Sequence, residues 1–421
     1  MKPNYLLVTI LVLFSTDLKA QWDIITSFNN AIMDMKSHNG NLYIGGGFTK
    51  NDNSTCYWSA YYDGTSIMRH TNLIGGGGVR KLDEFDGDLY AVGDMLHGSV
   101  IGVSRWDGST WVNGGGTNYS HSTLYSDGTE LYVESDDGVV RKKSIGGSFQ
   151  PYYDFAGNGG LGSIINYNNQ LIFAGSFDTI NGVPANNIAK WDGVNWTALG
   201  SGISSGTYSM AVFNSELYVA GDLSTAGGQN VNKIAKWNGA TWSDVGGGVT
   251  GTSWNDLRDM VVFNGALYVV GDFTEMGNVT THDVAKWDGN NWNSVNLAHT
   301  DAFANCVEVY ANKLYVGTFD IDTSHVFVYT GSTTTLEETD EVVEFNVFPN
   351  PFSKSITIQV DDRSPIHSFR IYDLGGKLVK TENGLSTEKL IIDRSSLPNG
   401  TYFLELISEN TVLGRQKIVI Q

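Results

Sequence analysis

Residues 210–242 decide the fold of this chain. Met210-Ala-Val-Phe-Asn-Ser-Glu-Leu-Tyr-Val-Ala-Gly-Asp222 is followed by a Gly-rich loop and then by Lys233-Ile-Ala-Lys-Trp237-Asn-Gly-Ala-Thr-Trp242. Short apolar runs rich in Val, Tyr, Phe and Trp, separated by Asn-Ser, Gly-Gly and Asn-Gly, are typical of strands and tight turns. The stretch therefore predicts a small antiparallel meander. Such a meander cannot bury both of its faces alone, so neighbouring copies must cover it.

Copies of this meander recur along the chain, and a Leu-Tyr step marks each of them. The steps are Leu42-Tyr43, Leu89-Tyr90, Leu131-Tyr132, Leu171-Ile172, Leu217-Tyr218, Leu267-Tyr268 and Leu314-Tyr315, at intervals of 40 to 50 residues. Intervals in the forties with four strand signals each are typical of propeller blades, whereas helical repeats would show a 3.6-residue apolar period. The sequence predicts an all-β chain with a seven-bladed β-propeller over residues 21–331.

Pairs of tryptophans around a tight turn support the count of copies. The pairs are Trp106 and Trp111, Trp191 and Trp196, Trp237 and Trp242, and Trp287 and Trp292. Asp-Gly or Asn-Gly between them supplies the positive φ that a tight hairpin needs. Because the pairs recur in four copies, we interpret them as packing between blades rather than as a binding site.

The last copy lacks a signal for its fourth strand. No tryptophan follows Gly331, whereas Trp22 precedes the first Leu-Tyr step at the spacing of a fourth strand. We therefore predict that residues 21–28 pair into the blade of Leu314 and close the ring. Closure would remove the open sheet edges that template aggregation.

The repeated segments resemble those of a known family. Ala174-Gly-Ser-Phe177, Asn187-Ile-Ala-Lys-Trp191-Asp-Gly193 and Ala198-Leu-Gly-Ser-Gly202 are similar to bacterial kelch-like propeller repeats. The resemblance covers roughly residues 22–331. It implies the fold and leaves the activity open, because propellers host unrelated functions.

The first twenty residues have the features of a secretory signal peptide. Lys2 lies near the start, an apolar run extends from Tyr5 to Phe14, and Ala20 precedes Gln21. That run is shorter than the roughly 20 apolar residues of a spanning helix, and no other membrane-spanning candidate follows it. We expect an exported chain that begins near Gln21.

The charge of the chain is acidic and unevenly placed. The formal net charge is −19 at pH 7, and residues 344–421 carry nine acidic and nine basic side chains. With a net charge of +1 on residues 1–20, about −20 falls on residues 21–343. Nucleic acids and anionic membranes require a basic surface. We expect neither as a partner, and the charge most simply serves solubility.

A separate module follows the repeats. Residues 332–343 are rich in Thr, Glu and Asp and predict a solvated linker. Residues 344–421 contain at least five short alternating strands with turns at Gly375-Gly376 and Asn399-Gly400. This pattern predicts a small β-sandwich.

The module resembles the type A C-terminal sorting domain of the type IX secretion system. The matching segments are Pro349-Asn350-Pro351, Asp373-Leu-Gly-Gly376-Lys-Leu-Val, Leu397-Pro-Asn-Gly400-Thr-Tyr402 and Lys417-Ile-Val-Ile. The resemblance implies export across both membranes, with the secretion machinery as a partner, to the outer cell surface or the medium. We interpret Pro349, Asn350, Gly376, Gly400 and Lys417 as the recognition framework, with turn formation as the alternative role of the Gly and Pro residues.

No motif in the sequence indicates catalysis. A GxSxG elbow, HExxH and a phosphate-binding loop do not occur, the eight histidines show no metal-ligand spacing, and nothing indicates a cofactor. Glu134, Asp136, Asp137 and Arg141 are the only dense polar group outside the repeat pattern. They favour a solvated loop, and a polysaccharide lyase or glycosidase remains the alternative.

Two tryptophans outside the repeat pattern predict a binding face. Trp58 and Trp254 fall in loops that open on the same face of the predicted propeller, and Trp254 is followed by Asn255, Asp256 and Arg258. Loops of this kind carry ligand sites more often than framework strands do. An indole beside polar groups could stack on a sugar ring, or each indole could fold back under its own loop.

Cys56 and Cys306 map to the same face, in blades that would be neighbours in a closed ring. They could form a disulfide or remain two buried thiols.

The sequence as a whole favours a secreted or surface-bound binding protein with a glycan or protein partner. A propeller enzyme and a structural envelope protein are the alternatives.

Overall fold

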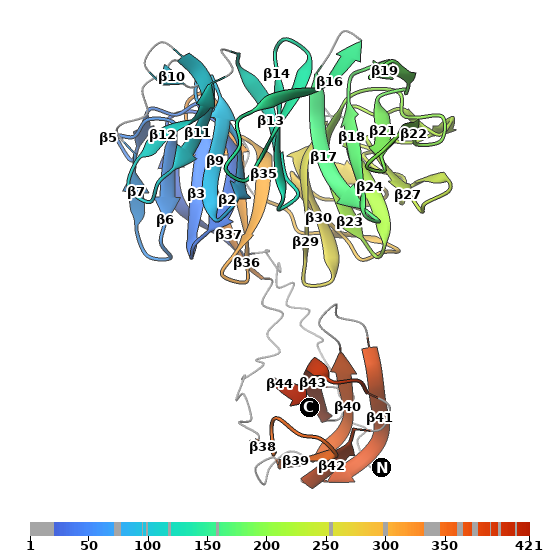
Figure 1. Cartoon of the computed structure of the whole chain (residues 1–421). Helices are drawn as coiled ribbons and strands as arrows, with labels where there is room; N and C mark the ends of the chain where they lie inside the picture. The colour runs from blue at the N-terminus through green and yellow to red at the C-terminus, as the bar shows by residue number, and fades with distance from the viewer. Residues whose placement is uncertain are drawn as a thin grey trace, which may run out of the picture. The chain divides into compact units, whose positions relative to one another are not determined.

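The computed structural model describes residues 21–70, 77–94, 96–97, 100–116, 119–156, 160–251, 256–297, 302–331, 346–359, 365–372, 378–387, 389–394, 397–408 and 411–421. Strands and turns make up these residues, and the fold is all-β (Figure 1). The chain divides into two compact units, Met1–Ser332 and Thr333–Gln421. The predicted signal peptide and linker lie outside the described residues.

In the first unit, the described strands form seven sets of four antiparallel neighbours. The sets, each from its first strand outward, are β2 (Ile32–His38), β3 (Asn41–Gly46), β6 (Ser59–Tyr62) and β7 (Ile67–Arg69); β8 (Val79–Phe85), β9 (Asp88–Gly93), β11 (Val100–Trp106) and β12 (Trp111–Gly116); β13 (His121–Ser126), β14 (Glu130–Ser135), β15 (Val139–Ser144) and β16 (Gln150–Ala156); β17 (Leu161–Tyr167), β18 (Gln170–Gly175), β21 (Ile188–Trp191) and β22 (Trp196–Ala198); β23 (Thr207–Phe213), β24 (Glu216–Gly221), β27 (Ile234–Trp237) and β28 (Trp242–Asp244); β29 (Asp256–Phe263), β30 (Ala266–Asp272), β33 (Val284–Trp287) and β34 (Trp292–Ser294); and β35 (Phe303–Tyr310), β36 (Lys313–Phe319), β37 (Ser324–Gly331) and β1 (Gln21–Phe28). Each Leu-Tyr step of the sequence lies on the second strand of its set.

Shorter strands lie between the second and third strands of several sets. They are β4 (Lys50–Asn51), β5 (Ser54–Thr55), β10 (Leu96–His97), β19 (Thr179–Ile180), β20 (Val183–Pro184), β25 (Thr225–Ala226), β26 (Gln229–Asn230), β31 (Glu275–Met276) and β32 (Val279–Thr280). In Figure 1, β10 and β19 mark the end of the unit on which these excursions lie.

The first strands of the sets surround a common axis. β2 contacts β8, and the contacts continue through β13, β17, β23 and β29 to β35, which contacts β2 again. Apolar side chains fill the space between successive sets: one core cluster joins Phe213 and Tyr218 of one set to Leu257 and Trp287 of the next. Each set therefore buries its faces against its neighbours, as the repeat pattern requires.

The N-terminal strand joins the last set to the first. β1 pairs antiparallel with β37 from Gln21, opposite Gly331, to Phe28, opposite Ser324. Phe28 also pairs with Asn51 of β4, and the buried Asn51 side-chain amide donates to the Ser27 carbonyl at 2.9 Å. This pairing confirms the prediction that residues 21–28 add to the sheet of Leu314.

The paired tryptophans face each other across the outer hairpins. Trp237 lies opposite Trp242, and their ring centroids are 5.2 Å apart. The Trp242 indole N–H donates to the Leu199 carbonyl of the preceding set at 3.1 Å. The equivalent Trp292 donates to the Val245 carbonyl at 2.9 Å. The interpretation of these tryptophans as packing between sets is confirmed.

The second unit consists of two antiparallel sheets. One contains β38 (Asn346–Phe348), β39 (Ser355–Gln359) and β42 (Lys389–Asp393), and the other contains β41 (Leu378–Thr387), β40 (Ile366–Tyr372), β43 (Gly400–Ser408) and β44 (Thr411–Ile420). Alternate apolar residues of both sheets, such as Ile356 and Leu404, share one buried cluster.

Candidate functional site

Every first strand has an irregularity at the same place in its repeat. The pairing register shifts between Ile32 and Asp34 in β2, and it shifts at the equivalent residues in the other six first strands. A bulge of this kind bends the strand and changes the direction of a side chain. The residues that follow the bulge, eight positions before the Leu of each step, are Asp34, Lys81, Thr123, Ser163, Ser209, Asp259 and Cys306.

Most of these side chains are polar, and carboxylates among them connect neighbouring first strands. The bonds run from the Leu82 N–H to Asp34 (2.7 Å), from the Ser126 N–H to Asp83 (2.8 Å), from the Val307 N–H to Asp259 (3.0 Å) and from the Ser37 N–H to Glu308 (3.1 Å). Hydroxyls extend the series: Ser209 donates to Asp259 at 2.8 Å, and Thr123 donates to the Leu161 carbonyl at 2.5 Å. Polar contacts therefore hold the first strands together around the axis.

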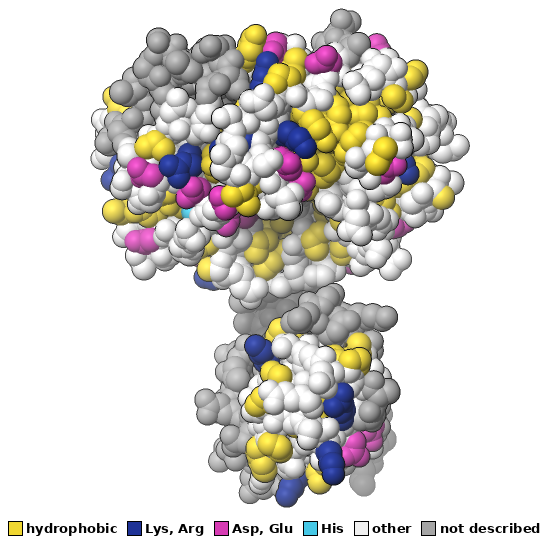
Figure 2. Space-filling model, in the orientation of Figure 1, with side chains coloured by type: hydrophobic (Ala, Val, Ile, Leu, Met, Phe, Trp, Pro, Cys, Tyr) yellow, Lys and Arg dark blue, Asp and Glu magenta, His cyan; other side chains and the backbone are white. Residues whose placement is uncertain are grey.

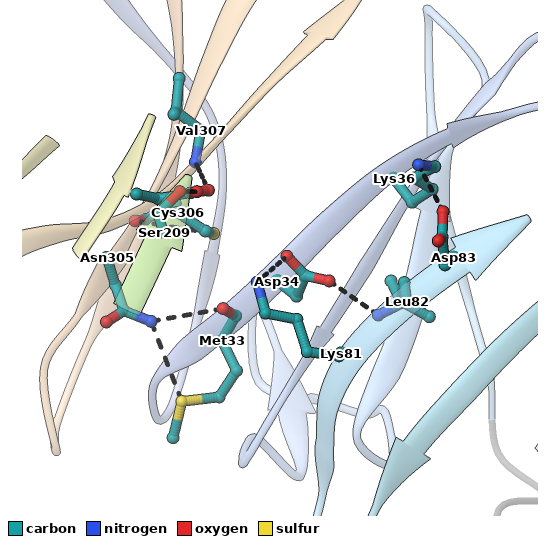
Figure 3. A network of polar contacts seen from close by, with 12 residues as sticks. Met33, Asp34, Lys36, Lys81, Leu82, Asp83, Ser209, Asn305, Cys306 and Val307 are labelled. Carbon is teal, nitrogen blue, oxygen red and sulfur yellow. Dashed lines mark hydrogen bonds and ion pairs between the residues drawn. The ribbon is translucent and has the colours of Figure 1, made fainter. Parts of the chain in front are cut away.

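Two lysines balance part of this negative charge. The Lys81 ammonium lies 3.3 Å from Asp34, and the Lys36 ammonium lies 2.7 Å from Asp83 (Figure 3). Burial raises the pKa of Asp34, although Lys81 opposes the effect, and the Asp34 carboxylate raises the pKa of Lys81. Burial also raises the pKa of Glu308 to about 7.

These first strands surround a cavity of about 210 Å³ on the axis. Its walls include Lys81, Ser163, Tyr208, Asp259 and Glu308. A concave site with convergent polar groups is the usual form of a small-molecule site. Sequence reasoning missed it, although aligning the copies on their Leu-Tyr steps would have placed the polar residues in one column.

An aromatic and cationic cluster lies beside the cavity. The guanidinium carbon of Arg258 is 5.2 Å from the ring centroid of Tyr208 and 5.4 Å from that of Phe303. Arg258 also pairs with Asp256 at 2.9 Å, and Phe303 stacks on Phe319 with ring centroids 5.1 Å apart. We call Tyr208, Asp256, Arg258, Phe303 and Phe319 the Tyr208 cluster.

The Tyr208 cluster contains two of the predicted site residues. Asp256 and Arg258 belong to it, whereas Trp254 and Asn255 lie outside the described residues. Tyr208 keeps 40% of its surface exposed and lines the axial cavity. Sequence reasoning missed Tyr208 because it lies in the regular part of a strand.

The structure does not bring Trp58 to this cluster. Trp58 is half-buried and packs against Tyr43, Leu89 and Trp106 between the first and second sets. Its backbone has φ 57°, and its N–H donates to the Phe48 carbonyl at 2.9 Å. These contacts match the alternative in which the indole folds under its own loop.

Cys56 and Cys306 are free, buried thiols in the structure and do not form the disulfide considered from the sequence. Cys306 lies on a first strand at the axis, whereas Cys56 lies between β5 and β6. Burial raises the pKa of both, that of Cys56 to about 11, which disfavours the reactive thiolate.

The polar group of the third set is engaged in internal contacts. Arg141 forms two bonds to the Asp137 carboxylate, at 2.9 and 2.5 Å. Glu134 is buried beside Ser122, and burial raises its pKa. Asp136 is exposed, so the four residues do not form one open loop as expected.

In the second unit, one residue of the predicted sorting framework clamps the last strand. The Asn350 amide donates to the Lys417 carbonyl and accepts from the Val419 N–H, both at 2.8 Å. Pro349 precedes Asn350 through a cis peptide bond with Phe348, and Gly400 begins β43 opposite Ile420. Gly376 lies outside the described residues.

Lys and Arg side chains on the visible face of the first unit lie singly among acidic and uncharged groups (Figure 2). Within the described ranges, no helix is long and apolar enough to cross a membrane. The same residues contain no group of three or more His, Cys, Asp or Glu placed to hold a metal ion.

Comparison with solved structures identifies likeness of fold. The chain is similar to PorZ, a surface component of the type IX secretion system of Porphyromonas gingivalis, with 12% identity, a TM-score of 0.48 and coverage of 93% of this chain and 59% of that one. Virginiamycin B lyase from Staphylococcus aureus is 10% identical with a TM-score of 0.52, over 73% of this chain and 99% of that one. The WD40 β-propeller domain of Doa1 is 10% identical with a TM-score of 0.49, over 73% of this chain and 97% of that one.

Comparison of sequences identifies the second unit. No curated protein matches the chain. Residues 346–421 match the family of secretion system C-terminal sorting domains, which confirms the predicted sorting module. The chain therefore carries a C-terminal sorting domain of the type IX secretion system, and the protein is secreted to the cell surface or beyond it.

Proposed function

We propose that this protein is a secreted binding protein rather than an enzyme, and that residues 21–331 form a seven-bladed, kelch-like propeller closed by β1. Seven sets of four strands among the described residues and the circular order of first-strand contacts support the architecture. In this proposal the second unit is a β-sandwich that directs export by the type IX machinery.

The proposed ligand is a glycan, bound at the Tyr208 cluster. The observation that carries this proposal is an exposed aromatic ring beside an Arg–Asp pair at the edge of a polar cavity. Sugar rings stack their apolar faces on aromatic planes, while their hydroxyls bond to neighbouring polar groups. Tyr208 supplies the plane, and Asp256 and Arg258 supply the polar groups. Trp254 and Asn255, two and one residues before Asp256, belong to the same proposed site.

A glycan array with the secreted protein tests this proposal. We expect selective binding that Tyr208→Ala and Trp254→Ala each weaken at least tenfold, which corresponds to about 1.4 kcal/mol. Tyr57→Ala is the matched control, because Tyr57 is an aromatic residue of similar exposure on another set. Binding that survives both substitutions would contradict the proposed site.

Turnover of the bound glycan would favour the alternative of a polysaccharide-degrading enzyme. Absence of glycan binding together with capture of one specific surface protein would favour a protein partner.

A further inference from the structure

The axial cavity has a different chemistry from the Tyr208 cluster, because charged groups of both signs line it. Asp34 pairs with Lys81, and Asp83 pairs with Lys36. Both carboxylate oxygens of Asp259 are occupied, one by the Ser209 hydroxyl and one by the Val307 N–H. The aspartates therefore have their bonds within the protein.

Other groups of the cavity retain unused hydrogen-bonding capacity. An ammonium group has three donors, and Lys36 and Lys81 each use one on a carboxylate within the described residues. Glu308 accepts the Ser37 N–H through one oxygen, and its second oxygen has no hydrogen-bond partner in the described part of the chain. The Ser163 hydroxyl likewise bonds to none of the described residues. The cavity thus offers several donors and an acceptor at its wall.

The charge balance selects the kind of molecule that these groups can bind. An anion would meet four carboxyl groups, and a cation would meet two lysines whose charges already pair with aspartates. Introducing a net charge into this partly desolvated space carries an electrostatic cost. A hydroxyl donates and accepts at once, so a neutral polyhydroxylated molecule can use donors and acceptors together.

The size of the cavity sets an upper limit on the ligand. Its volume of about 210 Å³ is below the roughly 300–1,000 Å³ of pockets for drug-sized ligands. We propose that the axial cavity is a binding site for one small, neutral, polyhydroxylated molecule of monosaccharide size, held by Lys36, Lys81, Ser163 and Glu308. This site goes beyond glycan stacking at the Tyr208 cluster, because Ser163 and Glu308 lie on other sets.

Calorimetric titration of the full secreted chain tests this inference. The neutral probes are D-glucose, D-galactose and myo-inositol, and the charged probes are D-glucuronate and D-glucosamine. We expect at least one neutral probe to bind and each charged probe to bind at least tenfold more weakly. Titrations in which no neutral probe binds, or in which a charged probe binds more tightly, would overturn the proposal.

Two variants locate the binding. Ser163→Met fills the cavity without removing a bond between strands, and we expect it to weaken the neutral probe at least tenfold. Ser243→Met, at an exposed position on β28, is the control that leaves the affinity unchanged. Glu308→Gln keeps an acceptor for the Ser37 N–H but changes the second oxygen into a donor, so it also weakens binding and decides the question if Ser163→Met fails to fold. Unchanged affinity in a folded Ser163→Met protein, or in Glu308→Gln, would show that the probe binds elsewhere.

Discussion

At the scale of single residues, one repeat position explains why Trp58 is a structural residue. Trp58, Asn187, Lys233 and Asp283 each lie just before or at the start of the third strand of their set, and their φ angles are 57°, 62°, 66° and 62°. The left-handed conformation at this position turns the chain into the strand. The position serves the backbone, and its side chain varies from set to set.

The same position holds an unfavourable pair of carboxyl groups in the sixth set. Lys233 pairs with Asp222, but the equivalent residues of the next set are Asp283 and Asp272. Burial, with a smaller contribution from Asp272, raises the pKa of Asp283 from 3.8 to about 8. Between these two values the folded protein holds a proton that the unfolded chain has lost. The free energy of unfolding therefore falls as the pH rises from 3.8 to about 8.

We predict that Asp283→Asn stabilises the protein in a pH-dependent way. Asn187 occupies the equivalent position and accepts the Phe177 N–H at 3.1 Å, so an amide fits there. Urea unfolding should give the variant its largest advantage at about pH 9, of at least about 1.4 kcal/mol for each unit of pKa shift removed, and little advantage at about pH 4. The exposed control Asp23→Asn should show no such trend. An advantage of Asp283→Asn that is independent of pH would contradict the argument.

At the scale of the elements, the sequence predicts strands and turns well because both have local signals. Alternating apolar residues and Asn-Gly or Asp-Gly pairs indicate each hairpin without reference to the rest of the fold. The third set has four strands, β13 to β16, although its tryptophan pair is missing, because its Leu-Tyr step and turns remain. A bulge has no comparable local signal, so the axial position of Asp34 or Ser163 was not predicted.

The bulge of β17 brings two backbones unusually close. A Cβ atom on Gly162 would lie 1.6 Å from the Thr207 carbonyl oxygen of the next first strand. We predict that Gly162→Ala forces β17 and β23 apart and lowers the free energy of unfolding by about 1–3 kcal/mol in urea titrations. Gly47→Ala is the control, because its nearest contact would be an ordinary 3.6 Å. Equal stability of the two variants would show that the first strands do not approach as described.

At the scale of the whole molecule, the repeats made the architecture predictable and the seam testable. Seven Leu-Tyr steps and a missing fourth strand sufficed to assign residues 21–28 to the last set, and β1 does pair with β37. Long-range placement around the axis depends on contacts between copies, which one copy of the sequence does not specify. The Tyr208 cluster was found only in part for this reason: Arg258 was singled out, whereas Tyr208 and Phe303 come from two other sets.

Closure of the ring by β1 is the central claim, and amide hydrogen exchange at the seam of the secreted chain tests it most directly. The amides of β1 and β37 that pair across the seam should exchange as slowly as those between β24 and β27 inside the fifth set, because both pairs are buried between neighbouring sets. Exchange of the β1 and β37 amides at the rate of unpaired chain, with β24 and β27 still protected, would contradict closure by the N-terminal strand.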